Sequence, residues 1–197
     1  MKKYFFLLLM ISLVVVSCKQ NYPPKPRGYF RITLPEHSYR EFDSAGCPFT
    51  FKVPVYSEMI PDEDANAQQW WMNLVFPTMN ATLHLSYKEL HGDSTLYRAI
   101  EDCHKLTYKH ISRAEDIIEN EITNNNGAGG MVYELNGETA SGMNFYVTDS
   151  LHHFVRGALY FNAKTVPDSL APSLDFLKQD VRMLIGSLRW RDVGKSK

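Results

Sequence analysis

The N-terminus constrains the chain more than any other stretch. Lys2 and Lys3 precede a run of 13 residues, 4–16, that is apolar except for Ser12. The run ends in Val15-Val16, and Ser17-Cys18 follow it. Crossing a bilayer takes about 20 apolar residues, so the run is too short for a transmembrane helix. It also lacks the cap and amphipathic period of a buried core helix. The pattern is typical of a lipoprotein signal peptide, and we predict that residues 1–17 are removed and that Cys18 carries the lipid.

Lipid attachment decides where the rest of the chain lies. Two or three acyl chains, palmitate among them, hold a protein on a membrane far more firmly than a single chain does. We therefore expect a protein anchored in the cell membrane or the outer membrane. Removing the signal leaves 180 of the 197 residues, which suits one domain with a sizeable core.

Charge and composition exclude two classes of protein. The formal net charge is −1 and becomes −3 once Lys2 and Lys3 are removed, so the basic excess needed to bind nucleic acid is missing. Hydrophobic residues make up 44% and aromatic residues 13% of the chain. Such a composition indicates a packed globule and not a disordered chain.

No motif for catalysis or metal binding stands out in the chain. Cys47 and Cys103 could form a disulfide outside the cytoplasm or remain buried thiols, and their spacing leaves both alternatives open. No zinc spacing is present, and the adjacent His152 and His153 would point to opposite faces of a strand. A Gly-x-Ser-x-Gly nucleophile motif is also missing. We therefore expect no catalytic residues, no metal ligands, no cofactor and no small-molecule substrate.

The segment after Cys18 is rich in proline. Pro23, Pro24 and Pro26 favour polyproline II, so residues 18–32 form a stiff tether, and ten residues at about 3.1 Å each span roughly 30 Å. An ordinary linker would contain few aromatic rings. Either Tyr29, Phe30 and Ile32 pack back on the domain, or the segment is a docking site for a partner. The candidate docking residues here are Tyr22, Arg27, Tyr29, Phe30 and Arg31.

Alternating apolar and polar residues predict strands in the domain, 33–191, which a polar tail, 192–197, follows. The expected strands are 49–53, 70–76, 81–87, 117–123, 130–135, 140–148 and 152–161, with a short strand at 188–190. The last four of the seven long strands form an antiparallel meander, and Asn136-Gly137 predicts a tight type I′ hairpin within it. In the strand 81–87, Thr82, His84 and Ser86 share the less apolar face.

Two helices are expected to cover this sheet. The first runs from about Thr95 to Arg113 with Asp93 or Ser94 as its cap. The second starts at Pro167 and ends near Gly186, with an apolar stripe of leucines. We expect its polar residues to face outward: Asp175, Lys178, Gln179, Asp180 and Arg182. The prediction is an α+β fold, an antiparallel sheet of about six to seven strands covered by two main helices.

The Pro-rich stretch from Tyr22 to Ile32, just after a lipobox cysteine, resembles the N-terminal signature of the GldD family of gliding-motility lipoproteins. Trp70-Trp71 and Leu188-Arg189-Trp190 are similar as well, which adds Trp70 and Trp71 to the candidate docking residues. The strand and helix order resembles the PsbP and Mog1 layout.

The resemblance implies an accessory lipoprotein of the gliding machinery, which in such bacteria is entwined with type IX secretion. It implies cell-envelope gliding and secretion proteins as partners, protein–protein contacts in place of enzymatic activity, and no catalytic residues. Surface-exported lipoproteins of such bacteria resemble one another in carrying acidic residues after the acylated cysteine. Lys19-Gln20-Asn21 carries none, which favours an anchor that faces the periplasm.

Four Asp-Ser steps resemble the O-glycosylation acceptors of exported proteins in these bacteria, although Asp-Ser also suits turns and helix caps. The candidate acceptors are Ser44, Ser94, Ser150 and Ser169. Two alternatives to the adaptor remain, a periplasmic ligand-binding module and an uncharacterised hydrolase. A cleft with converging polar groups beside His84 and Ser86 would favour these alternatives. A flat exposed aromatic patch near Trp70 and Trp71 would favour a protein partner.

Overall fold

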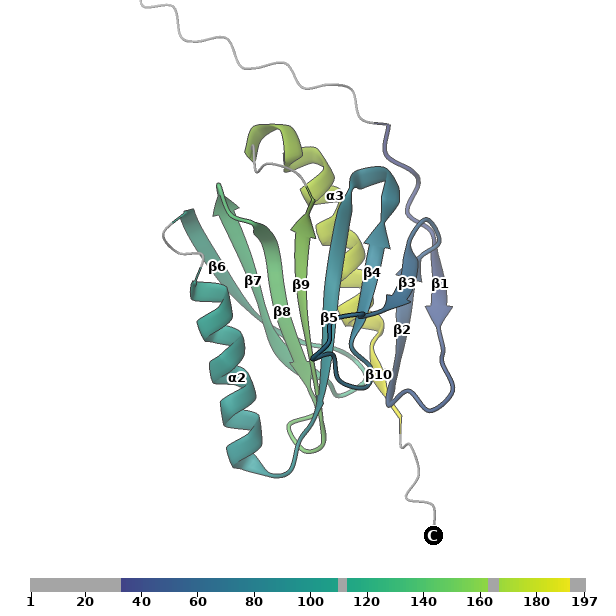
Figure 1. Ribbon diagram of the computed structural model, residues 1–197, viewed down its shortest axis with the longest axis vertical. Helices are drawn as coiled ribbons and strands as arrows, with labels where there is room; N and C mark the ends of the chain where they lie inside the picture. Colours follow the sequence, from purple (N-terminus) through teal and green to yellow (C-terminus); the bar gives the residue numbers. More distant parts are fainter. Residues whose placement is uncertain (1–32, 110–112, 163–166, 192–197) are drawn as a thin grey trace, which may run out of the picture.

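A computed structural model describes residues 33–109, 113–162 and 167–191, and these residues form an antiparallel sheet with a helix on each face (Figure 1). The helices are α2 (Asp93–Tyr108) and α3 (Pro167–Ser187). The strands are β1 (Tyr39–Phe42), β2 (Phe49–Pro54), β3 (Glu58–Pro61), β4 (Met72–Phe76), β5 (Ala81–Glu89), β6 (Ala114–Thr123), β7 (Gly129–Gly137), β8 (Ser141–Thr148), β9 (His153–Phe161) and β10 (Arg189–Trp190).

The main sheet has seven strands in the order β3-β4-β5-β9-β8-β7-β6. All of its pairs are antiparallel, and β6 to β9 follow one another as the predicted meander. The strand β9 then pairs with β5, so the two halves of the chain meet at the centre of the sheet. This arrangement confirms the α+β prediction.

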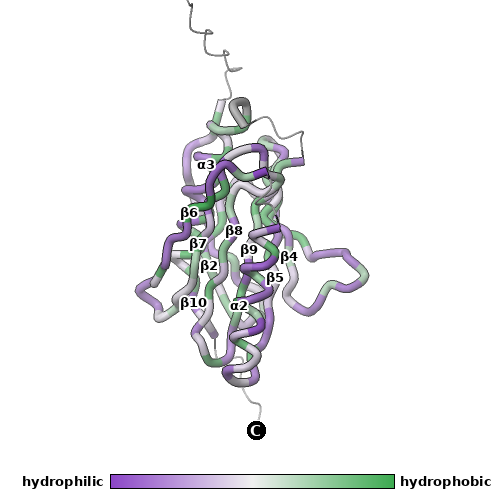
Figure 2. The backbone as a smooth tube through the Cα atoms, turned by 90° about the vertical axis from the view of Figure 1, so that its left-hand side faces the viewer, coloured by the Kyte–Doolittle hydropathy of each residue, from purple (hydrophilic) through white to green (hydrophobic). Residues whose placement is uncertain are grey.

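Alternation along each strand divides the sheet into two faces with separate cores. On one face Leu83, Phe145 and Leu159 are fully buried and pack with Leu177 and Leu184 of α3. On the other face a smaller cluster of Tyr133, Leu135 and Phe154 packs against Ala99 and Cys103 of α2. Figure 2 views the molecule from the side where α2 and the edge strand β6 lie in Figure 1, and hydrophilic colour covers much of both elements.

A second, three-stranded sheet of β1, β2 and β10 completes the main core. Phe49, Phe51 and Val53 of β2 are buried in the same cluster as the leucines of α3. After α3, β10 returns to pair with β2, so Trp190 lies opposite Phe49. The N-terminal strand β1 is the outer strand of this small sheet, and it pairs with β2 from Tyr39 to Phe42.

Several local predictions need correction. The connection between β7 and β8 is not a two-residue turn at Asn136-Gly137: both residues pair with β6, and the chain turns at 138–140. The helix α2 begins at Asp93 and ends at Tyr108, earlier than expected, and its N-cap is Gly92 with φ 91° and no side-chain cap. The strands β1 and β3, of four residues each, were not predicted.

The expected outward face of α3 is wrong at two positions. Asp180 is 1% exposed and Lys178 is 7% exposed, whereas Asp175, Gln179 and Arg182 are exposed as predicted. Each of the two buried charges has a partner. Lys178 contacts Glu134 at 2.9 Å, and Asp180 accepts hydrogen bonds from residues near the N-terminus of the domain. Among the described helices, none has the length and apolar content to cross a membrane.

Candidate functional site

The candidate residues of the tether all lie outside the described residues. This holds for the lipidation candidate and the first docking candidates: Cys18, Tyr22, Arg27, Tyr29, Phe30 and Arg31. Trp70 and Trp71 are described, and both are half-buried. Trp71 Nε1 donates a hydrogen bond to the carbonyl oxygen of Tyr87 at 3.1 Å, and Trp70 packs against the main core. Their role in docking stays a prediction.

The candidate glycosylation sites differ in exposure. Ser94 at the start of α2 and Ser150 in the β8–β9 turn are exposed, and Ser150 has φ 65°. Ser44 in the β1–β2 turn is half-buried. Ser169 lies in the first turn of α3, in a part whose side chains are not described. Modification of these serines stays a prediction.

The two cysteines are buried on opposite faces of the sheet. Cys47 belongs to the main core and Cys103 to the cluster under α2, and both are free thiols. A disulfide between them is therefore excluded by their positions. Burial raises the pKa of the Cys103 thiol to about 11 and also raises the pKa of Cys47, so neither sulfur is an activated nucleophile.

The less apolar face of β5 is only partly covered, because α2 lies over β8 and β9. On the uncovered part, His84 Nδ1 lies 2.7 Å from Asn73 Oδ1, and its ring meets the ring of Tyr160 edge to face at 5.5 Å. Partial burial lowers the pKa of His84, and Arg156 lowers it further, although Asp62 opposes the shift. The pKa of His84 is thus lowered, and its Nδ1 atom is engaged by Asn73.

A polar cluster around one buried carboxylate joins the start of the domain to α3. We call His37, Tyr39, Tyr56 and Asp180 the Asp180 cluster. Tyr56 Oη donates to Asp180 Oδ2 at 2.6 Å, and Tyr39 Oη donates to Oδ1 at 3.0 Å. His37 Nδ1 lies 2.8 Å from Oδ1, while its ring stacks on Phe176 at 4.0 Å.

The cluster fixes the point at which the tether enters the domain. Residues 33–38 precede β1, and His37 and Tyr39 bond to a carboxylate more than 140 positions further along the chain. Burial raises the pKa of Tyr39 to about 12, with the bond to Asp180 and its charge adding to the effect. Because a buried carboxylate needs donors, this contact resists separation of the N-terminal segment from α3.

Sequence reasoning missed the Asp180 cluster, although a signal for it exists. Asp180 lies three residues after Leu177 and four before Leu184, so its position on the helix is within the apolar stripe. A carboxylate at such a position requires buried donors. Their identity could not be read from local sequence, since they come from the other end of the domain.

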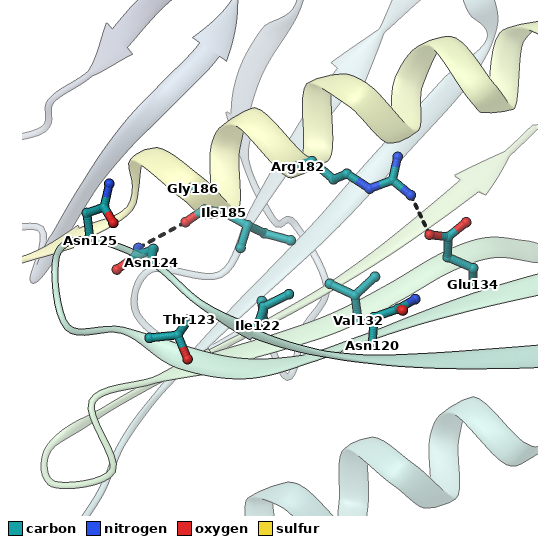
Figure 3. Close-up of a pocket in the computed structure, with 10 residues that line it drawn as sticks. All are labelled: Asn120, Ile122, Thr123, Asn124, Asn125, Val132, Glu134, Arg182, Ile185 and Gly186. Carbon is teal, nitrogen blue, oxygen red and sulfur yellow. Dashed lines mark hydrogen bonds and ion pairs between the residues drawn. The ribbon is translucent and has the colours of Figure 1, made fainter.

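A groove of about 520 Å³ lies between α3 and the outer strands β6 and β7 (Figure 3). Ile122, Val132 and Ile185 form its apolar part. Other lining residues are Asn120, Thr123, Asn124, Asn125, Glu134, Arg182 and Gly186. The groove therefore combines an apolar floor with a polar border.

The two ionic groups and one of the amides at this border already have partners. Arg182 of α3 forms an ion pair with Glu134 of β7, which also contacts Lys178 (Figure 3). The cations outweigh burial and lower the pKa of Glu134, so this carboxylate stays ionised. Asn124 Nδ2 donates to the carbonyl oxygens of Ile185 at 3.1 Å and Leu188 at 2.9 Å, which fixes the β6–β7 turn on the end of α3.

The strand β6, at the edge of the main sheet, borders this groove. Within the described residues β6 has one neighbour, β7, and it is the last strand of the main sheet. It carries four acidic residues and no basic residue over ten positions. Glu119 accepts a hydrogen bond from Tyr108 Oη at 2.6 Å and lies 3.9 Å from His104 Nε2.

Comparisons with known proteins agree with the lipoprotein character of the sequence. No curated protein matches the chain. A solved structure of PsbP (CyanoP) from the cyanobacterium Synechocystis sp. PCC 6803 is similar at 10% identity, with a TM-score of 0.47, over 80% of this chain and 95% of that chain. The family model for the gliding motility lipoprotein GldD matches residues 19–190.

That match covers the described domain and extends into the Pro-rich stretch that carries the resemblance. The family is one of lipoproteins, which is consistent with a lipid-anchored protein of the cell envelope. The chain belongs to the GldD family of gliding motility lipoproteins.

Proposed function

We propose that this lipoprotein acts as an adaptor: lipidated at Cys18 and facing the periplasm, it assembles or stabilises the gliding and type IX secretion machinery through protein–protein contacts. The observation that carries the proposal is the groove beside β6. Its ionic groups are paired with one another, while its apolar floor and the adjoining strand edge are uncovered among the residues that the structure describes. Such a surface suits a segment of another protein.

A reactive site would need a different arrangement. Catalysis requires a nucleophile or base that is free to act on a substrate. The thiols of Cys47 and Cys103 are buried with raised pKa values, which makes them poor nucleophiles. Within the described residues, His, Cys, Asp and Glu side chains form no group of three or more that could hold a metal.

The anchored geometry also supports an adaptor role. The tether is expected to hold the domain roughly 30 Å from the lipid, and the Asp180 cluster attaches the domain end of the tether to α3. A partner that binds near β6 would therefore be held at a defined height above the membrane. The absence of acidic residues in Lys19-Gln20-Asn21 supports the periplasmic side.

Chemical crosslinking in intact gliding cells, followed by purification of this lipoprotein from solubilised membranes, tests the proposal. The expected result is co-purification of motility or secretion components of the envelope. A variant with Cys18→Ala, which removes the lipid anchor, serves as the control and should lose these components. Recovery of the lipoprotein alone from crosslinked wild-type cells would contradict the adaptor role.

A further inference from the structure

We propose that β6 is a docking strand, to which a partner adds an extended segment in which cationic and apolar side chains alternate. The inference rests on the proposed function and specifies the chemistry of the partner. Addition of a strand to an open sheet edge supplies backbone hydrogen bonds, and alternate side chains supply specificity.

The two ends of the main sheet differ in their capacity to accept a strand. At one end β3 has four residues and finishes at Pro61, which lacks a backbone donor. At the other end β6 has ten residues, and proline is not among them. Proteins commonly block exposed edges with short strands and prolines. By these two criteria, and within the described parts of the chain, β3 is blocked and β6 is available.

Register assigns the side chains of β6 to the two faces of the sheet. Ile117 lies opposite Leu135 and packs in the cluster under α2. Because side chains alternate, Glu119 and Glu121 lie on this same face. Asn120 and Ile122 face the other way and line the groove beside α3.

The charges on the two faces select different partner residues. Residues of the added strand opposite Glu119 and Glu121 meet two carboxylates, so lysine or arginine fits there. Residues on the other face meet Ile122, Val132 and Ile185 in the groove. Arg182 borders that groove and disfavours a second cation. The partner strand therefore alternates cationic residues toward α2 with apolar residues toward α3.

A second copy of this chain does not fit the same edge. Pairing two β6 strands would bring together the acidic residues of both copies, since each strand carries Glu115, Asp116, Glu119 and Glu121 and no basic residue. Like charges on paired strands are destabilising. The added strand consequently belongs to a different protein.

A synthetic peptide tests the inference directly. The probe is a capped nine-residue peptide that alternates lysine with valine or threonine, and the control is a peptide of equal composition with its lysines in one block. Binding is measured on the acylated protein in nanodiscs of phosphatidylcholine, whose zero net charge avoids lysine adsorption to the lipid. Hydrogen exchange followed by mass spectrometry reports which amides the peptide protects.

We expect the alternating peptide to bind and to slow amide exchange within β6. Replacing both Glu119→Lys and Glu121→Lys should weaken binding by at least about tenfold, because two favourable charge pairs become repulsive. The matched variant Glu58→Lys with Glu63→Lys makes the same charge change on β3, at the opposite edge, and in the loop that follows it, where both residues are exposed. It should bind like the wild type.

Three results would overturn the inference: no binding of the alternating peptide at millimolar concentration, equal binding of the blocked peptide, or protection outside β6. The hydrogen-exchange readout on the wild type holds even if a variant fails to fold. These outcomes are separate from the proposed function. Loss of peptide binding in a variant that still recovers motility components from cells would place the adaptor contact elsewhere and leave the peptide site standing.

Discussion

Replacing Asp180 with alanine should destabilise the domain and loosen the point at which the tether enters it. The carboxylate is 1% exposed and accepts hydrogen bonds from Tyr56 at 2.6 Å and Tyr39 at 3.0 Å, with His37 at 2.8 Å. A hydrogen bond to a charged group contributes about 1.5–3 kcal/mol to stability.

The three contributions do not add in full. His37 and Tyr39 are less buried than the carboxylate, so they regain bonds to water once Asp180 is removed. Tyr56 is half-buried like Tyr39 and regains such bonds in part. Removal of the buried charge also ends its desolvation cost. We therefore expect a loss of about 3 kcal/mol, which for a domain of this size lowers Tm by about 6–12 °C.

Urea unfolding of the full-length protein, followed by circular dichroism, measures this free energy. Asp175→Ala is the matched control, because this aspartate is on the same helix but exposed, and it should change the free energy of unfolding by less than about 0.5 kcal/mol. Hydrogen exchange in residues 33–42 should rise in Asp180→Ala alone. A free energy of unfolding within about 0.5 kcal/mol of the wild type would refute the reasoning.

Three further predictions concern stability and reactivity. Gly157→Ala should cost about 2 kcal/mol, because its Cβ would lie 2.1 Å from Phe145 Cε1 in the core; urea unfolding measures the loss, and Phe145→Leu in the same chain should recover part of it. The thiol of Cys103, whose burial raises its pKa to about 11, should react with iodoacetamide at pH 8 far more slowly in the folded than in the urea-unfolded protein; equal rates would show that it is accessible. Stability should also fall as pH rises above about 10, the pKa of tyrosine in the unfolded chain. The loss continues through about 12, the pKa of Tyr39 in the folded protein, because folding favours the protonated phenol. Unfolding free energies at pH 9 and 11 measure this loss, and a loss equally steep in Asp180→Asn would show that the carboxylate does not contribute.

Regular patterns in the sequence predicted the long elements of the fold. The alternation in β5 and β9 and the leucine stripe of α3 reflect burial against one layer, which local sequence records. The strands β1 and β3 were not predicted, because four residues are too few to show an alternating pattern. The helix α2 begins after Gly92, which has a φ of 91° and occupies the N-cap position. The side-chain cap that the sequence predicted is therefore not formed.

The Asn136-Gly137 pair shows how a correct backbone signal can be assigned to the wrong structure. Gly137 does adopt a positive φ, 100°, as a type I′ turn would require. It lies opposite Ala114, where the register between β6 and β7 shifts. Glycine with positive φ also suits a β-bulge, and the distinction depends on the neighbouring strand, which the local sequence does not specify.

The site residues were less predictable than the fold. Hydrogen-bond partners of Asp180 come from positions 37 to 56, so no local pattern could identify them. The groove depends on how α3 crosses β6 and β7. Sequence did identify the acidic, isoleucine-containing stretch as a strand, but its place at the sheet edge follows from the pairing of β9 with β5.

Site-specific photo-crosslinking in gliding cells tests the adaptor role most directly. A photoreactive amino acid at Asn120, on the groove face of β6, should yield a discrete adduct with an envelope protein of the motility or secretion machinery. The same amino acid at Glu58, on β3 at the opposite edge of the sheet, should not yield this adduct. Normal gliding of both strains together with no adduct from Asn120, or the same adduct from both positions, would contradict the account.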